Sequence, residues 1–274
     1  MPPKFDDQTC KTGLHILKDK WKQKTHMKLY CEYLLKGDRL SQIIESTYEA
    51  APERELDLRF VRVPNQNMDS TQRERIWEKA IYERWKNGNA LPKSLDAWEQ
   101  IVAYQVPLRA GGVAQQGDKG WGEIDALGVF KNSLVVIELK REPRPNGDGT
   151  TSSSETPLKI LLQSVAYAIA MQKNWIRVRE QVRSLQTNCV LPDKAKIKLV
   201  GAVPAAYWLD WIPVTDKGTK ELSAEVWTSF FKLVDLFKKL GFPISFVSLS
   251  GDPNDPKTLT VQPLKGLRSV LLGK

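Results

Sequence analysis

The segment 122–140 limits most strongly what this chain can fold into. It contains two apolar runs, 123–130 and 134–140, which are joined through the polar pair Lys131-Asn132. Two runs of strand-forming residues around so short a connection predict an antiparallel β-hairpin. The hairpin in turn determines which side chains of the two runs face one another.

The register of this hairpin brings three charged residues together. If Lys131 and Asn132 form the turn, Asp125 lies directly opposite Glu138, with Cβ atoms about 4.5–5.5 Å apart. Side chains alternate along a strand, so Lys140 projects from the same face as Glu138. A turn shifted by one residue places Asp125 opposite Lys140 instead. The three side chains share one face in either register.

Two carboxylates held side by side repel each other unless a cation neutralises them. A divalent ion would do so, and oxygen ligands without a nearby histidine or cysteine favour Mg²⁺ or Mn²⁺ over Zn²⁺. Lys140 beside that ion could orient or help deprotonate an attacking water, or neutralise charge on a phosphorane-like transition state. The alternative is an exposed hairpin in which Lys140 simply forms an ion pair with Glu138 or Asp125.

The periodicity of the remaining sequence predicts an α/β protein. Apolar residues recur at helical spacing from residue 12 to residue 85, and a short helix is expected over 92–102. The first three expected strands are joined too closely for helical crossovers and are therefore antiparallel. We divide the chain into an N-terminal helical region, 1–90, and a core domain, 91–274. The core is expected to contain strands at 104–109, 123–130, 134–140 and 197–203, helices at 157–171 and 222–240, and short apolar runs at 244–249 and 258–261.

The composition bears on partners and on cellular compartment. The chain has 41 Lys and Arg against 32 Asp and Glu, a net charge of +9, which favours an anionic partner and nucleic acid first. Basic residues concentrate at 11–28 and 173–198, and each stretch is either a phosphate-facing surface or an ordinary solvated face. Because no apolar run reaches about eighteen residues and the N-terminus lacks the pattern of a secretory signal, we expect a cytoplasmic protein with no membrane partner.

Three motifs follow one another along the chain. They are Gly122-Glu-Ile-Asp125, Glu138-Leu-Lys140 at the end of the run Leu-Val-Val-Ile, and Gln163-Ser-Val-Ala-Tyr167. In this order they resemble the motifs of the PD-(D/E)XK nuclease superfamily, and the last is similar to the Gln-x-x-x-Tyr motif of the branch that contains the bacterial recombination exonucleases. The resemblance covers about residues 94–205 and extends to the order of helices and strands. Ile124 stands where the name-giving proline would be, at a position that varies in the superfamily.

The resemblance implies a restriction-endonuclease-like core, with a central mixed β-sheet flanked by helices. It also implies a role for each matching residue. Asp125 and Glu138 would bind the metal, and the Leu139 carbonyl would add a ligand. Lys140 would be the catalytic lysine, and Gln163 would reach toward the site.

The superfamily commonly has another acidic residue on the helix before the first strand. Three candidates precede the hairpin here: Glu99, Glu78 and Glu74. Glu99 borders the apolar stripe of the short helix expected before the first strand and could point inward. Glu74 is explained as the capping-box partner of Thr71. We favour Glu99 over Glu78.

The sequence therefore predicts a Mg²⁺-dependent deoxyribonuclease that hydrolyses phosphodiester bonds by in-line attack of a metal-bound water. One alternative is a catalytically silent nucleic-acid-binding protein of the same fold, although a pure binder has no need of a repelling carboxylate pair. A second alternative is a ribonuclease, because a metal-bound water attacks either backbone.

Overall fold

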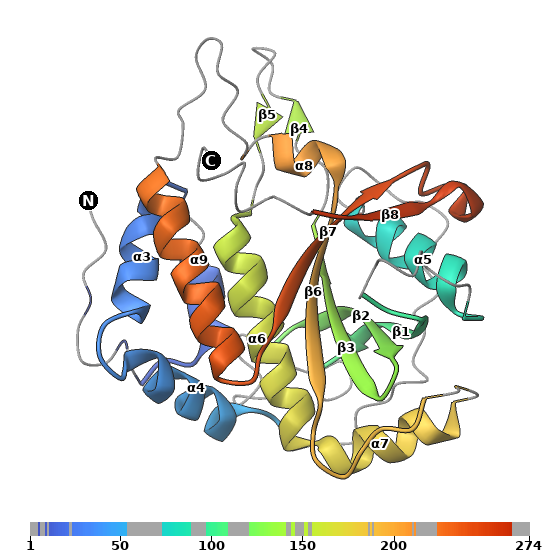
Figure 1. The fold of residues 1–274 in the computed structure, drawn as a ribbon, viewed down its shortest axis with the longest axis horizontal. Coiled ribbons are helices and arrows are strands. Elements are labelled where there is room, and N and C mark those ends of the chain that lie inside the picture. The colour runs from blue at the N-terminus through green and yellow to red at the C-terminus, as the bar shows by residue number, and fades with distance from the viewer. Residues whose placement is uncertain are drawn as a thin grey trace.

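A mixed β-sheet lies at the centre of the protein. The computed structural model describes residues 11–21, 24–53, 73–88, 97–108, 121–140, 155–185, 189–209 and 224–264, and also residues 5, 9, 144–145, 151–152, 187 and 211. Six strands form the sheet in the order β1-β2-β3-β6-β7-β8, and helices cover both of its faces (Figure 1). The α/β fold with a central mixed sheet is the one that the sequence predicts.

The strand directions determine where functional groups can gather. β1, β2 and β3 pair antiparallel, β6 and β7 join β3 in parallel, and β8 returns antiparallel. Consequently β3, β6 and β7 end at the same edge of the sheet. The strands are β1 (Gln100–Pro107), β2 (Glu123–Phe130), β3 (Ser133–Leu139), β6 (Ile197–Pro204), β7 (Ile244–Ser250) and β8 (Thr260–Pro263), and a separate two-stranded ribbon consists of β4 (Arg144–Pro145) and β5 (Thr151–Ser152).

The β2–β3 hairpin adopts the first of the two expected registers. Ala126 pairs with Ile137, so the next position outward places Asp125 opposite Glu138. Lys131, in the turn, has a φ of 53°. This left-handed conformation is the one that the favoured two-residue hairpin turns require.

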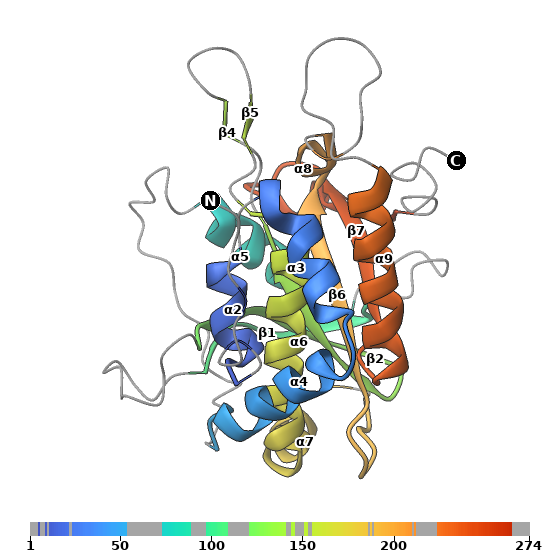
Figure 2. The ribbon, with the colours of Figure 1, turned by 90° about the vertical axis from the view of Figure 1, so that its left-hand side faces the viewer.

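Helices form two layers on one face of the sheet and one on the other (Figure 1), and Figure 2 looks onto the face that carries two layers. α6 (Pro157–Lys173) packs on β3 and β6, and α9 (Ala224–Lys239) packs on β7. α2 (Leu14–Lys20) and α4 (Arg39–Ala50) lie against α6, and α3 (Met27–Leu34) lies against α9. α5 (Arg73–Trp85) packs on the opposite face, against β1, β2 and β3. The shorter helices are α7 (Trp175–Ser184), α8 (Ala205–Leu209), η1 (Lys24–His26) and η4 (Pro256–Thr258).

Side chains alternate along the strands, so each strand contributes residues to two apolar cores, one on each face of the sheet. Leu134 and Val136 belong to the core on the α6 side, whereas Val135 and Ile137 belong to the core on the α5 side. The α6-side core also contains the apolar residues of α2, α3 and α4. The expected boundary at residue 90 therefore does not separate two cores. Among the described helices, none has both the length and the apolar character needed to cross a membrane.

The prediction of a short helix over 92–102 is wrong for the residues of this range that the structure describes. Residues 100–102 belong to β1 instead, and 89–96 lie outside the described residues. Ile101, Val102 and Ala103 are all buried, because this part of β1 is covered on both faces. A strand buried on both faces has no period-two alternation, so its apolar run resembles a helix segment.

Candidate active site

The structure brings the three charged hairpin residues together at one end of the β2–β3 pair. Asp125 is partly exposed, whereas Glu138 is 0% and Lys140 5% exposed. The Leu139 N–H donates a hydrogen bond of 2.7 Å to Asp125 Oδ2. The hairpin backbone therefore holds the Asp125 carboxylate directly beside Glu138.

Lys140 is surrounded by carboxylates from three separate elements. Its ammonium forms an ion pair with Glu138 in the same strand segment. It also lies 3.4 Å from Glu74 Oε1, on α5, and 3.0 Å from Glu155 Oε2, just before α6. The alternative of an exposed hairpin is wrong, because Lys140 and Glu138 are buried. The ion pair that this alternative assumed is nevertheless present, within a larger cluster.

Burial and mutual repulsion disfavour the ionised carboxylates of this cluster. Burial raises the pKa of Glu138 to about 7, although Lys140 opposes the increase. Burial and then the charge of Glu138 raise the pKa of Asp125 well above its usual value. Burial alone would lower the pKa of Lys140, but Glu138, Glu74, Glu155 and Asp125 outweigh it and raise the pKa well above its usual value. Lys140 is therefore a cation at neutral pH.

α6 supplies a second wall of the site. Thr156 caps its N-terminus by accepting a hydrogen bond from the Lys159 N–H, and Pro157 begins the helix. One turn further, Gln163 Nε2 donates to the Tyr167 hydroxyl at 3.0 Å. Glu138 and Asp125 are among the causes that raise the pKa of Tyr167, after burial. The charges of these carboxylates therefore act on the Tyr167 hydroxyl, which accepts the hydrogen bond from Gln163.

The structure corrects the choice of the upstream glutamate. Glu99 is exposed and accepts a hydrogen bond from the Lys131 N–H, at the turn end of the hairpin. Asp125 and Glu138 lie at the opposite end. The expected helix would have allowed Glu99 to point inward. The chain instead enters β1 at Gln100, and Glu99 lies beside the hairpin turn. Glu78 and Glu74, on α5, are the upstream acidic residues that the fold brings to the cluster.

Glu78 has an environment unlike that of a surface carboxylate. It is 5% exposed and accepts a hydrogen bond of 2.7 Å from Gln105 Nε2. Burial, and next the charge of Asp125, raise its pKa well above its usual value, while the bond from Gln105 lowers it. Glu78 is therefore a buried acidic group electrostatically coupled to Asp125.

Sequence reasoning missed two residues that the structure places in or next to this cluster. Glu155 contacts Lys140 and Lys159, and these two lysines outweigh burial and lower its pKa to about 2. It belongs to a polar segment with no periodicity, so no pattern pointed to it. Gln105 belongs to β1, whose apolar run gave no reason to single out one polar residue.

N-terminal residues reach the edge of the same site. The Trp121 ring, fully buried, stacks on His15 of α2 with ring centroids 4.5 Å apart. The Lys18 ammonium lies 5.9 Å from the centre of the Tyr167 ring. Burial, and next the charge of Lys18, lower the pKa of His15 to about 4, so His15 is neutral at pH 7. Trp121 thus has a packing role that connects α2 to the start of β2.

The site offers oxygen atoms, the type of ligand that a hard divalent cation prefers. Asp125 and Glu138 offer carboxylate oxygens from neighbouring strands, and Glu138 Oε2 is buried with no hydrogen-bond partner among the described residues. Burial is the first cause of their raised pKa values, and a bound cation would favour their ionised forms. Within the described residues, no three His, Cys, Asp or Glu side chains already stand close enough together to hold a metal.

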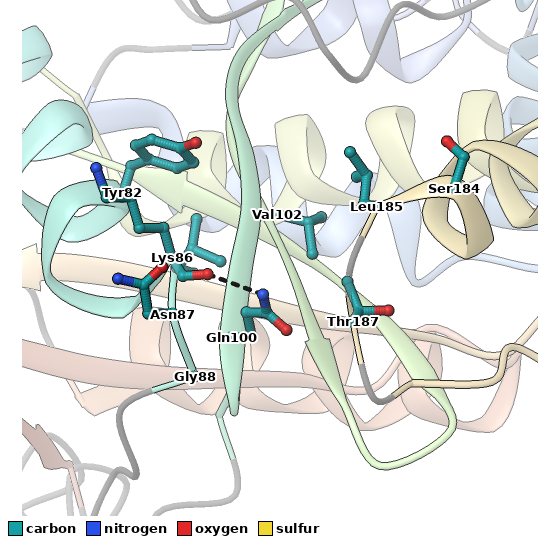
Figure 3. A pocket seen from close by; sticks show the side chains of 10 residues that line it. Tyr82, Lys86, Asn87, Gly88, Gln100, Val102, Ser184, Leu185 and Thr187 are labelled. Carbon is teal, nitrogen blue, oxygen red and sulfur yellow. Dashed lines mark hydrogen bonds between the residues drawn. The ribbon is translucent and has the colours of Figure 1, made fainter.

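Other polar features lie far from the carboxylates. A pocket of about 560 Å³ opens between the end of α5, the start of β1 and the segment after α7 (Figure 3). Gln100, which lines it, precedes Gln105 by five residues, or about 17 Å of strand. Lys196, in the basic stretch 173–198, also lies away from the site, since it contacts Asn132 in the hairpin turn.

Comparison of the chain with family models, with curated proteins and with solved structures finds no match in any of the three.

Proposed function

We propose that this protein is a Mg²⁺- or Mn²⁺-dependent nuclease that hydrolyses phosphodiester bonds of DNA. The observation that carries the proposal is the direct pairing of Asp125 with Glu138 across the hairpin, with Lys140 beside them. Two carboxylates held side by side, one of them fully buried, are costly as scaffolding. It is useful where a divalent ion and a phosphate are bound.

Each side chain of the cluster has a defined part in this proposal. Asp125, Glu138 and the Leu139 carbonyl hold the ion, and Glu78 adds a further carboxylate. Lys140, held among these carboxylates, provides positive charge next to the phosphate that is attacked. Gln163 orients the substrate or the water from α6. When bound, the divalent ion supplies charge that activates water and stabilises the transition state.

DNA is the proposed substrate because the chain carries a net charge of +9. Such an excess attracts a polyanion and accelerates its association. A cluster of Asp125, Glu138 and Glu78 would repel the phosphate backbone by itself. The dispersed basic residues and the bound cation reverse that repulsion, and backbone contacts of this kind favour no particular base sequence.

A cleavage assay tests the activity directly. The wild type is incubated with circular DNA, linear DNA and RNA, each with Mg²⁺ and with EDTA. We expect Mg²⁺-dependent cleavage of DNA that Asp125→Asn abolishes. Glu99→Gln is the matched control, because Glu99 is an acidic residue on the other end of the sheet. Cleavage in EDTA, or full activity of Asp125→Asn, would contradict the proposal, and cleavage of RNA alone would make the protein a ribonuclease.

A calorimetric titration with Mn²⁺ tests the metal site separately from cleavage. The wild type and Glu99→Gln should bind the ion, and Asp125→Asn should bind it more weakly. Equal affinity in all three proteins would show that the ion is held elsewhere.

One observation favours a second candidate, a nucleic-acid-binding protein that does not cut. Lys140 already pairs with Glu138 and lies near Glu155, so the cluster is partly neutralised without a metal. The two assays separate the candidates. Binding of DNA without Mn²⁺ binding or cleavage would identify a silent binder.

A further inference from the structure

One residue of β1 has a backbone conformation that strands do not normally contain. Gln105 has a φ of 51°, although Tyr104 and Val106 on either side pair regularly with β2. A left-handed conformation is unfavourable for a residue other than glycine, because its Cβ comes too close to the following carbonyl oxygen. Such strain persists only where the surroundings enforce it, and it concentrates at functional sites.

This strained residue lies next to the two carboxylates of the hairpin in the order of the strands. Tyr104 pairs with Ala126 and Val106 with Ile124, so Gln105 is opposite Asp125. Asp125 is in turn opposite Glu138 on β3. The strained residue therefore stands in line with the two carboxylates, across three neighbouring strands.

The side chain of Gln105 makes a contact that connects the sheet to α5. It is 3% exposed, and its Nε2 donates to Glu78 Oε2 at 2.7 Å. The bond joins residues 27 positions apart in the chain. A hydrogen bond to a buried carboxylate favours its ionised form, which is the form that binds a cation.

We propose that Gln105 is a positioning residue that holds the Glu78 carboxylate beside Asp125, so that Glu78 completes the acidic site. This inference rests on the proposed metal-dependent function. The unusual conformation of β1 at this point directs the amide to α5 rather than leaving it in the regular alternation of the strand. A glycine would adopt this backbone at lower cost but would leave Glu78 without its donor.

The strand contains a matched control. Gln100 is also a β1 glutamine whose side-chain amide donates a hydrogen bond, at 2.8 Å, to the Lys86 carbonyl after α5 (Figure 3). Gln100 thus connects the same strand to the same helix, but at the end remote from Asp125. Gln105→Asn tolerates a left-handed backbone and is too short to make the same contact with Glu78. Gln100→Asn removes the equivalent contact elsewhere.

The experiment uses the full chain and compares the wild type with Gln105→Asn and Gln100→Asn. Calorimetry measures the Mn²⁺ affinity of each protein, and the melting temperature in EDTA shows whether each variant folds. We expect Gln105→Asn to weaken Mn²⁺ binding about 10- to 100-fold, the usual effect of removing a partner of a metal ligand. Gln100→Asn should leave the affinity unchanged. If Gln105→Asn fails to fold, Gln105→Gly replaces it, because glycine relieves the strain.

A double-mutant cycle shows whether Gln105 acts through Glu78. In the Glu78→Gln background, Gln105→Asn should have little further effect on Mn²⁺ affinity. Additive effects, or a Gln105→Asn protein with wild-type affinity, would overturn the inference while leaving the nuclease proposal intact. Absence of Mn²⁺ binding by the wild type would overturn both.

Discussion

The sharpest prediction concerns how stability depends on pH in Glu138→Gln. Glu138 is fully buried, and its pKa in the folded protein is about 7 against an ordinary value of 4.5. Because the folded-state pKa is raised, the protonated carboxyl stabilises the fold at low pH. That contribution is complete below about pH 4.5 and is lost as the pH rises through about 7.

The magnitude follows from the two pKa values. At about 1.4 kcal/mol for each tenfold change in proton affinity, the ionised Glu138 destabilises the folded state by about 3 kcal/mol at pH 8 relative to pH 4. For a chain of this size, that corresponds to roughly 6–12 °C in melting temperature. Glutamine resembles the protonated carboxyl, so Glu138→Gln should lose this part of the pH dependence.

The assay is chemical denaturation of both proteins in EDTA at pH 5, 6, 7 and 8. The free energy of unfolding of the wild type should fall more steeply with pH than that of Glu138→Gln. Lys140 does not affect the comparison of slopes, because its raised pKa keeps it charged throughout this range. The raised pKa of Asp125 adds to the difference, since Glu138 is one of its causes. Parallel pH profiles would refute the reasoning.

Three further predictions follow from other contacts. Lys140→Ala should cost about 3–5 kcal/mol in urea denaturation at pH 8, because it leaves buried carboxylates unpaired, and less at pH 5; an equal loss at both pH values would contradict this. Gly201→Ala should cost about 1–3 kcal/mol, because its Cβ would lie 2.7 Å from the Phe246 ring. Unchanged stability would mean that β6 and β7 separate easily. Replacing the exposed Arg177 and Arg183 by Gln should make the salt dependence of long-DNA binding shallower by up to about 2 log–log units, and an unchanged slope would assign α7 to solvated surface.

Burial gives Lys140 a larger part in stability than its position in the sequence indicates. A lysine at the end of a strand is ordinarily exposed and contributes little to stability. Lys140 is instead buried among carboxylates from β3, α5 and the segment before α6. Likewise, Arg179 in the basic stretch already pairs with Asp193, so two arginines of α7 rather than three are available for phosphate.

The sequence by itself determined the local features of this protein. Two strand-forming runs joined by Lys131-Asn132 predicted the hairpin and placed Asp125, Glu138 and Lys140 on one face in either of two registers, because side-chain alternation and turn length are local properties. The structure adopts the register that places Asp125 opposite Glu138. Gln163 and Tyr167 are four positions apart in the sequence, and in the structure Gln163 Nε2 donates a hydrogen bond to the Tyr167 hydroxyl.

Only the tertiary structure decided which distant residues join that hairpin. Glu78 and Glu74 reach it because α5 packs across β1, β2 and β3, and Glu155 reaches it because α6 begins at the end of the same sheet. The choice of Glu99 failed for the corresponding reason, since the apolar run of a strand buried on both faces resembles a helix. Packing of elements far apart in the chain leaves no periodic signal, so neither Glu155 nor the strained Gln105 could be read from the sequence.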